Sequence, residues 1–189
     1  MFGRNGKPQG SLGHMEGKQV SATASVTRVA HPVEGSNPAA SAPLNPILDF
    51  ARTRAADEGL PYAGGVTPVE AWKLVSSGEA LLVDVRTAEE RKFVGLVPDS
   101  IHVPWATGTA LTRNPRFVRD LENKVGKTAT VLLLCRSGKR SALAAEAAAK
   151  AGFTNVFNVL EGFEGDLDDQ QRRGSFNGWR HAGLPWTQD

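Results

Sequence analysis

Cysteine is almost absent from this chain: Cys135 is the only one among 189 residues. A single cysteine excludes a disulfide within the chain, a Cys-x-x-Cys redox pair and a Cys-x-x-Cys zinc knuckle, so the thiol acts alone or with the thiol of a partner. The lack of disulfides fits a reducing compartment. We therefore expect a cytoplasmic protein that uses neither a metal nor another cofactor.

Net charge and long apolar runs are scarce as well. The formal net charge is +2, and the basic residues outside the segment around Cys135 are scattered, so no nucleic-acid-binding surface is expected. No apolar run approaches the roughly 18 residues that span a bilayer, and residues 1–30 lack the basic-then-apolar order of a secretory signal. We expect neither a nucleic acid nor a membrane among the partners.

Three regions of the chain differ in composition. Residues 1–44 are rich in Gly, Ser, Pro, Asn and Ala without apolar periodicity, which predicts a disordered tail. Residues 10–15 within it resemble a cloning linker of the kind that an expression vector adds. Asn45 followed by proline is a typical helix start and predicts a peripheral helix within residues 45–63. The compact domain is expected over residues 65–189.

Apolar runs alternate with helix signals through the compact domain. Strands are predicted at residues 80–85, 101–103, 130–134 and 156–160, and helices at residues 67–78, 87–94 and 142–151 and from residue 114. This alternation is typical of an α/β fold with a doubly wound, mostly parallel central sheet flanked by helices. The first of these helices is expected to turn Val69, Trp72, Leu74 and Val75 to the core.

Two motifs lie at the carboxyl ends of predicted strands, where open α/β sheets bind ligands. Asp84 and Arg86 follow one strand and Cys135 follows another, so the fold class alone brings them to one edge. Loop N–H groups and the positive end of the following helix stabilise an anionic sulfur in such a place. A buried structural cysteine is the alternative, but three cations and a glycine within the next five residues favour a thiolate.

Several segments together resemble the single-domain rhodaneses, the thiosulfate sulfurtransferase family. The matching pieces lie in the family's order over residues 67–163 and are Asp84-Val85-Arg86 with Glu90, Gly95 with Pro98 and Ile101-His102-Val103-Pro104, the cysteine loop Cys135-Arg136-Ser137-Gly138-Lys139-Arg140-Ser141, and Gly152-Phe153 with Leu160-Glu161-Gly162. The resemblance implies a rhodanese-like fold. It also implies a six-residue active loop from Cys135 to Arg140 and a cysteine that forms a persulfide.

Read with this resemblance, the loop residues are candidates to bind the substrate. Arg136, Lys139 and Arg140 are the candidates for the sulfonate end of a sulfur donor, with Arg136 the one expected to face water. Ser137 and Ser141 are candidates to donate hydrogen bonds to the sulfur, although Ser141 equally suits a helix start.

Other residues near these motifs are expected to support the site. Gly138 suits the left-handed backbone position that a loop around an anion demands. We expect Asp84 and Arg86 to form a structural ion pair or to brace the loop rather than to contact substrate. Trp105 either walls the pocket or fills the core. His102 is predicted to be a strand residue with a local hydrogen bond rather than a catalytic partner.

The activity implied by the resemblance is transfer of a sulfane sulfur. The Cys135 thiolate takes the outer sulfur of thiosulfate or a similar small anionic donor, and a thiol, cyanide or a sulfur-accepting protein then removes it. Two alternatives stay open. A cysteine-dependent phosphatase or arsenate reductase of the same fold carries Cys-x5-Arg, whereas Ser141 stands at that position here. A persulfide carrier without turnover needs the same thiolate.

The chain also departs from the family's pattern. Residues 95–100 read Gly-Leu-Val-Pro-Asp-Ser where the family commonly has Gly-His-Ile-Pro-Gly-Ala, so any role of that histidine is absent. A charged insertion at residues 164–177 separates Gly162 from Gly178-Trp179. We expect this insertion to be a solvated loop that could border the pocket.

Overall fold

A computed structural model describes residues 45–188, and the tail predicted over residues 1–44 lies outside the described residues. The centre of the fold is a five-stranded sheet in the order β1-β7-β6-β2-β3. Its strands are β1 (Gly65–Val66), β2 (Leu81–Asp84), β3 (Ile101–His102), β6 (Val131–Leu134) and β7 (Val156–Val159). Every neighbouring pair in this sheet is parallel, which confirms the predicted α/β fold class.

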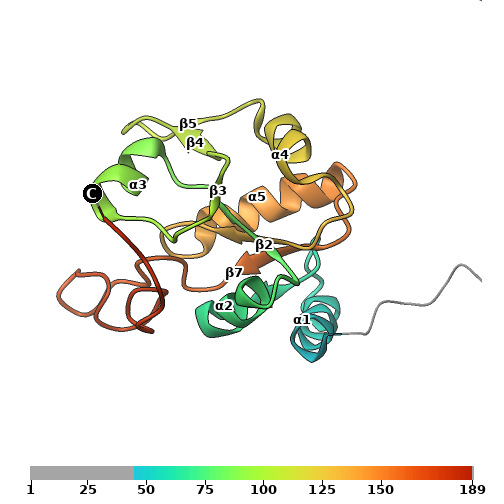
Figure 1. The fold of residues 1–189 in the computed structure, drawn as a ribbon, viewed down its shortest axis with the longest axis horizontal. Coiled ribbons are helices and arrows are strands. Elements are labelled where there is room, and N and C mark those ends of the chain that lie inside the picture. Colours follow the sequence, from blue (N-terminus) through green and yellow to red (C-terminus); the bar gives the residue numbers. More distant parts are fainter. Residues whose placement is uncertain (1–44, 189) are drawn as a thin grey trace, which may run out of the picture. The chain divides into compact units, whose positions relative to one another are not determined.

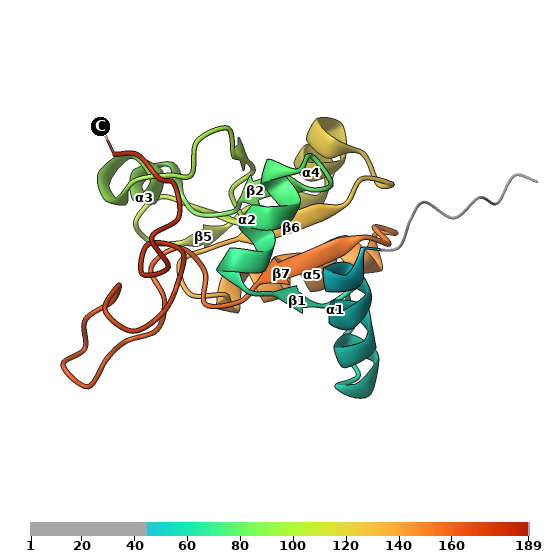
Figure 2. The same ribbon diagram turned by 60° about the horizontal axis from the view of Figure 1, so that its bottom comes forward.

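Helices cover both faces of the sheet, as Figures 1 and 2 show. They are α1 (Pro46–Asp57), α2 (Pro68–Ser76), α3 (Ala88–Val94), α4 (Phe117–Val125) and α5 (Lys139–Lys150). Helices α1 and α2 pack on one face and α4 and α5 on the other, whereas α3 buries none of its residues. Within residues 45–188, none of the helices combines the length and apolar character needed to cross a membrane.

Local signals in the sequence account for three of the helix starts. The Asn45 side chain accepts a hydrogen bond from the backbone N–H of Ile47. Thr67 and Thr87 each form a complete capping box with the glutamate three residues later. Each box satisfies two backbone donors that the helix leaves unpaired, so the starts of α2 and α3 are defined by their own residues.

Two apolar clusters fill the space between sheet and helices, and strand alternation decides which side chain joins which. Val83, Val85, Leu133 and Cys135 belong to the cluster beneath α4 and α5. Leu82, Leu132 and Leu134 belong to the cluster beneath α1 and α2, together with Phe157, Phe163 and Trp179. Because successive side chains of a strand point to opposite faces, Cys135 faces away from Leu134. It lies on the same side of the sheet as Leu133 and Val85.

The structure corrects several predicted boundaries. Helix α5 begins at Lys139, three residues before the alanine-rich stretch that predicted it, and α4 begins at Phe117 rather than at residue 114. Strand β1 and the antiparallel hairpin of β4 (Ala106–Thr107) and β5 (Thr112–Arg113) were not predicted. Each of these strands has two residues, which is too short to show a period.

One core assignment is also wrong. Val69 is 44% exposed, whereas Ala71 and Leu74 are buried. Pro68, Ala71 and Leu74 recur every three residues along α2 and form the face that packs on the sheet. Val69 directly follows Pro68, so its side chain is rotated away from that face and is exposed to solvent.

Candidate active site

Cys135 directly follows β6 at the carboxyl edge of the sheet, where the sequence places it. Its side chain is buried, with 1% exposed. The Ser141 hydroxyl lies 3.2 Å from Cys135 Sγ and 3.1 Å from the carbonyl oxygen of Gly138, so it can donate to the sulfur or to the backbone. Ser141 is in the first turn of α5, and both roles considered for it, sulfur contact and helix start, are compatible with its position.

The loop after Cys135 is rich in free backbone donors. None of the N–H groups of residues 136–141 has an acceptor among residues 45–188. Gly138 has a φ of +82° and forms the N-cap of α5 without a side-chain cap, which matches the left-handed position expected for it. Unpaired N–H groups at a helix N-terminus carry partial positive charge. The loop can therefore bind an anionic sulfur.

A segment after β7 supports this loop from its other side. The N–H of Phe163 donates to the carbonyl of Cys135 at 2.8 Å, and that of Glu164 donates to the carbonyl of Arg136 at 2.9 Å. Gly162 allows this approach, because a Cβ at that position would lie 2.5 Å from the carbonyl oxygen of Cys135. The loop is therefore held by residues about thirty positions later in the chain.

Asp84 and Arg86 form a buried ion pair next to Phe163 in this supporting segment. Neither side chain is exposed, and Arg86 Nη2 lies 2.7 Å from Asp84 Oδ2 and 2.8 Å from the carbonyl oxygen of Gly95. Arg91 adds a second cation 3.0 Å from the same carboxylate oxygen. The Arg86 guanidinium stacks 4.0 Å from the ring centroid of Phe163. Arg86 thus packs on the residue whose N–H holds Cys135.

Arg140 is joined to Glu90 by two hydrogen bonds, at 2.8 and 2.5 Å. Burial raises the pKa of Glu90, but the hydrogen bonds from Arg140 and the Thr87 backbone, with the charges of Arg140 and Arg86, outweigh it, so this pKa lies below its ordinary value. The hydrogen bond with Glu90 raises the pKa of Arg140, against burial, and the charges of Glu90 and Cys135 add to the rise. Arg140 is therefore a fixed cation within electrostatic reach of the sulfur.

The remaining loop side chains are free of such partners. Arg136 and Lys139 are exposed, and neither has a hydrogen-bond or ion-pair partner in the described part of the chain. Ser137 is half-buried. Of the three cations expected to bind substrate, the structure leaves two unengaged and ties the third, Arg140, to a carboxylate.

Trp105 and His102 lie on the neighbouring strand segment. Trp105 is 7% exposed and packs edge-on against Phe117 with ring centroids 5.0 Å apart, so it fills the core. His102 Nε2 lies 2.8 Å from the carbonyl oxygen of Arg86, which is the local hydrogen bond that the sequence predicts. The Lys124 ammonium donates to the His102 carbonyl at 2.6 Å.

The insertion at residues 164–177 is closed at its base. The Asn177 side chain accepts from the N–H of Asp166 at 2.7 Å and donates to its carboxylate at 3.0 Å. Most of the residues between them are exposed, as expected for a solvated loop. Its first residue, Glu164, donates its N–H to the carbonyl of Arg136, so the insertion borders the site through its base.

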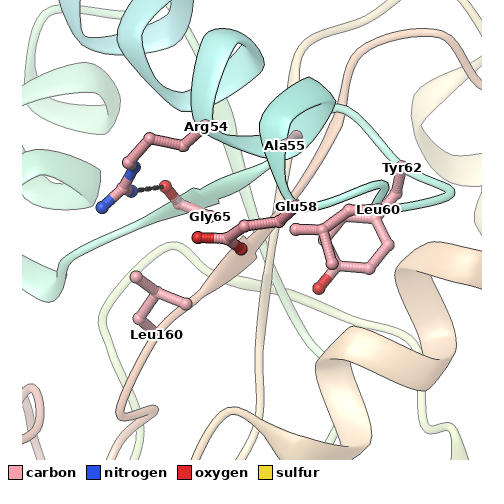
Figure 3. Close-up of a pocket in the computed structure, with 7 residues that line it drawn as sticks. All are labelled: Arg54, Ala55, Glu58, Leu60, Tyr62, Gly65 and Leu160. Atoms are coloured by element: carbon pink, nitrogen blue, oxygen red, sulfur yellow. Dashed lines mark hydrogen bonds between the residues drawn. The ribbon is translucent and has the colours of Figure 1, made fainter.

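Two hollows of the structure lie away from the cysteine loop. The first, about 190 Å³ in volume, is drawn in Figure 3 and is lined by Arg54, Ala55, Glu58, Leu60, Tyr62, Gly65 and Leu160. Arg54 Nη2 donates to the carbonyl of Gly65 at 2.7 Å there and so holds α1 against β1. The second, about 220 Å³, is lined by His102, Val103, Pro104, Asp120, Asn123 and Lys124. Neither contains a residue of the cysteine loop.

Three supporting residues of the site were not assigned from the sequence. In the sequence Glu90 is only part of a family motif, and its contact with Arg140 spans 50 positions. Gly162 is likewise only part of a family motif, and no pattern in the sequence points to Phe163. Contacts of this range depend on the order of strands in the sheet, which the sequence did not specify.

Comparison with known proteins adds the family to this geometry. The model of the rhodanese-like domain family matches residues 67–168. The chain belongs to the rhodanese-like family. The match covers both capping boxes, the Asp84-Val85-Arg86 motif and the cysteine loop, and it ends within the insertion.

Similar proteins include relatives in sequence and a protein of known structure. An uncharacterized protein of Rickettsia conorii is 35% identical over 118 residues, which cover 60% of this chain and 87% of the relative. Thiosulfate sulfurtransferase 16 of Arabidopsis thaliana chloroplasts is 29% identical over 122 residues, 64% of this chain and 89% of the relative. The crystal structure of Rv0390 from M. tuberculosis is 44% identical and has a TM-score of 0.62, covering 68% of this chain and 99% of that one. The predicted rhodanese fold is confirmed.

Proposed function

We propose that this rhodanese-like chain is a sulfurtransferase. It takes a sulfane sulfur from thiosulfate or a similar donor, holds it as a persulfide on Cys135, and passes it to cyanide or a thiol. The observation that carries this proposal is the placement of Cys135 at the mouth of α5, where no N–H group of residues 136–141 has an acceptor within the described residues. Membership of the rhodanese-like family supports it.

The chemistry consists of two displacements at sulfur. The Cys135 thiolate attacks the outer sulfur of thiosulfate, a bond forms between the two sulfurs, and the sulfur–sulfur bond of thiosulfate breaks with its electron pair leaving on sulfite. Cyanide then attacks the outer sulfur of the persulfide, thiocyanate leaves and the thiolate is restored. Neither displacement moves a proton, so no general base is required. The loop N–H groups stabilise the anion in both states.

The cations divide this work between them. Arg136 and Lys139 are exposed and unengaged, so they are the groups that bind the sulfonate end of the donor. Arg140 is occupied by Glu90 and acts through its charge rather than through a fork to substrate. Asp84 and Arg86 are fully buried and hold the loop in place through Phe163.

The residue at the sixth position after Cys135 disfavours the phosphatase alternative. Ser141, the sixth residue after Cys135, points its hydroxyl at the sulfur, where a Cys-x5-Arg loop presents a guanidinium. The arginine one position earlier is joined to Glu90 through both of its terminal nitrogens. A phosphate in this loop would lack the paired hydrogen bonds that an arginine at the sixth position provides.

Single-turnover sulfite release tests the proposal. Chain and thiosulfate are mixed at comparable concentration without an acceptor, and free sulfite is measured. We expect one equivalent of sulfite per chain, steady thiocyanate formation once cyanide is added, and neither product with Cys135→Ser. Hydrolysis of a phosphate ester without sulfite release would establish the phosphatase instead. Uptake of sulfur from a protein persulfide, without turnover of small donors, would establish the carrier.

A further inference from the structure

The hairpin of β4 and β5 places Arg113 over the outer face of Trp105. The Arg113 guanidinium carbon lies 3.3 Å from the centroid of the Trp105 ring. Arg113 is exposed while Trp105 is buried, so the guanidinium covers the ring from the solvent side. Arg113 has no hydrogen-bond or ion-pair partner among residues 45–188. Stacking fixes the plane of the guanidinium and leaves the N–H groups at its edge unoccupied.

The hairpin is built to hold this arginine in place. Arg113 pairs with Ala106 across the two strands. The next residue, Asn114, donates its backbone N–H to the carbonyl of Trp105 at 2.9 Å and its side-chain amide to the carbonyl of Pro104 at 2.9 Å. In both ribbon views the hairpin lies between α3 and α4 (Figures 1 and 2). Arg113 is thus fixed by its backbone and by its stacked side chain.

Trp105 stands on the same face of the sheet as the cysteine, with one strand between them. The N–H of Val85 donates to the carbonyl of Leu134, and the N–H of Trp105 donates to the carbonyl of Val85. Val85, Trp105 and Cys135 all belong to the apolar cluster beneath α4 and α5. Two strand spacings of roughly 4.8 Å place the Trp105 backbone about 10 Å from that of Cys135.

This separation decides what Arg113 can bind. In thiosulfate the sulfonate is bonded directly to the sulfur that is transferred, so while that sulfur meets Cys135 the sulfonate stays within the loop. A cation stacked on Trp105, whose backbone lies about 10 Å from that of Cys135, reaches only a charge carried on a longer molecule. A carboxylate several bonds from the reacting sulfur satisfies that requirement, and planar carboxylates match the edge of a guanidinium.

We infer that Arg113 is a specificity residue that binds the carboxylate of an organic persulfide, a donor larger than thiosulfate. This inference rests on the proposed sulfur transfer. The Cys135 thiolate attacks the outer sulfur of the protonated persulfide, the sulfur–sulfur bond of the donor breaks, and the electron pair leaves on the organic thiolate. The proton stays on the outer sulfur of the new enzyme persulfide, so no oxidant or reductant is needed.

Three sulfur donors distinguish binding of a carboxylate by Arg113 from simple packing of Arg113 on Trp105. Glutathione persulfide carries carboxylates, cysteamine persulfide carries none, and thiosulfate is compact. We expect Arg113→Gln to raise KM for glutathione persulfide about five- to tenfold, with kcat unchanged and both constants for the other two donors within about twofold. Arg119→Gln, at an exposed arginine of α4, is the matched control and should change none of them.

The outcomes also distinguish the role of Arg113 from the sulfurtransferase activity on which it rests. Equal changes for all three donors, or no change for glutathione persulfide, would overturn the role of Arg113. A wild-type chain that uses thiosulfate but not glutathione persulfide would overturn it as well and leave the sulfurtransferase standing. A wild-type chain that takes sulfur from none of the donors would overturn both. Thermal unfolding of each variant shows whether a loss reflects misfolding.

Discussion

Gly162 is where the supporting segment meets the backbone of the cysteine loop. It has a φ of +67°, and an added Cβ would lie 2.5 Å from the carbonyl oxygen of Cys135 and 2.6 Å from the backbone nitrogen of Ser137. Gly174 has a φ of +83° but no atom within 4 Å of such a Cβ. The two glycines therefore share the backbone strain of an alanine and differ only in the clash.

Replacing each glycine by alanine separates loop geometry from strain. A left-handed alanine costs about 1–2 kcal/mol at either position. We expect Gly174→Ala to show that loss in urea unfolding and to keep kcat/KM, whereas Gly162→Ala loses more stability and at least about tenfold in kcat/KM, because the loop must shift. Equal kcat/KM for the two variants would show that the loop tolerates movement.

Ser141 supplies the one side-chain hydrogen bond to Cys135 Sγ within residues 45–188. Removing it with Ser141→Ala takes from an anionic sulfur a hydrogen bond worth about 1–1.5 kcal/mol, which corresponds to roughly five- to tenfold in a rate. We expect iodoacetamide to alkylate Cys135 more slowly by that factor. Ser76→Ala, at an exposed serine that bonds only to the Lys73 backbone, is the control. An unchanged rate would assign Ser141 to the helix start alone.

Short-range signals explain which residues of the site could be predicted. Cys135, Gly138 and Ser141 lie within seven positions between a strand and a helix, so their order alone places them in one loop. Trp105 could not be assigned, because its choice between pocket and core depends on Phe117 and on an unpredicted hairpin.

Helices α3 and α5 are joined by the pair of Glu90 and Arg140. Because α3 buries none of its residues, this partly buried pair has a large share in holding it. Glu90→Gln leaves a partly buried guanidinium without its charged partner, and we expect a loss of about 1–2 kcal/mol in the free energy of unfolding. Glu146→Gln, in the exposed pair with Lys150, should cost less than about 0.5 kcal/mol.

The contribution of Glu90 should also depend on pH in one direction. Its pKa is lower in the folded chain than in the unfolded chain, so the stabilisation is complete above the unfolded value of about 4.3 and is lost as pH falls through the folded value. The difference in unfolding free energy between wild type and Glu90→Gln should therefore be constant near neutral pH and shrink in acid below about pH 4. A difference that persisted there would mean that the carboxylate charge is not its source.

Element boundaries were predictable where the signal is local. The capping boxes at Thr67 and Thr87 define the starts of α2 and α3 in both sequence and structure. Helix α5 has no side-chain cap and begins at Lys139 after its N-cap Gly138, so an apolar pattern that starts at Ala142 misses its first turn. That turn carries Lys139, Arg140 and Ser141, so the loop between β6 and α5 is three residues shorter than the apolar pattern indicates.

Residues 179–187 pack against earlier parts of the domain. Trp179 is fully buried, packs edge-on against Trp72 and donates its indole N–H to the carbonyl of Pro185 at 2.9 Å. Thr187 forms an antiparallel bridge with Leu96, near α3. The segment after the insertion therefore contacts both α2 and the residues that follow α3.

Trp179→Ala should therefore destabilise the fold as a whole. Removing a buried tryptophan costs about 3–5 kcal/mol, which urea unfolding would register as a lower midpoint with the slope unchanged. Phe176→Ala, at a side chain 67% exposed in the insertion, should stay within about 0.5 kcal/mol of wild type. Similar losses for both variants would mean that the insertion is part of the core.

The fold class was predictable because apolar strands alternate with helices throughout residues 65–163. The strand order β1-β7-β6-β2-β3 was not, since it depends on pairings between segments far apart, and β1 has only two residues. Long-range contacts such as Glu90 with Arg140, and Gly162 with Cys135, follow from that order. The position of the cysteine loop at the carboxyl edge of the sheet could therefore be predicted from the sequence, and the contacts that support the loop could not.

Intact-mass spectrometry after exposure to thiosulfate tests most directly whether Cys135 carries a persulfide. The account predicts that the chain gains the mass of one sulfur atom, that cyanide removes it, and that Cys135→Ser never gains it. A wild-type mass that stays unchanged with thiosulfate and with an organic persulfide would contradict the account.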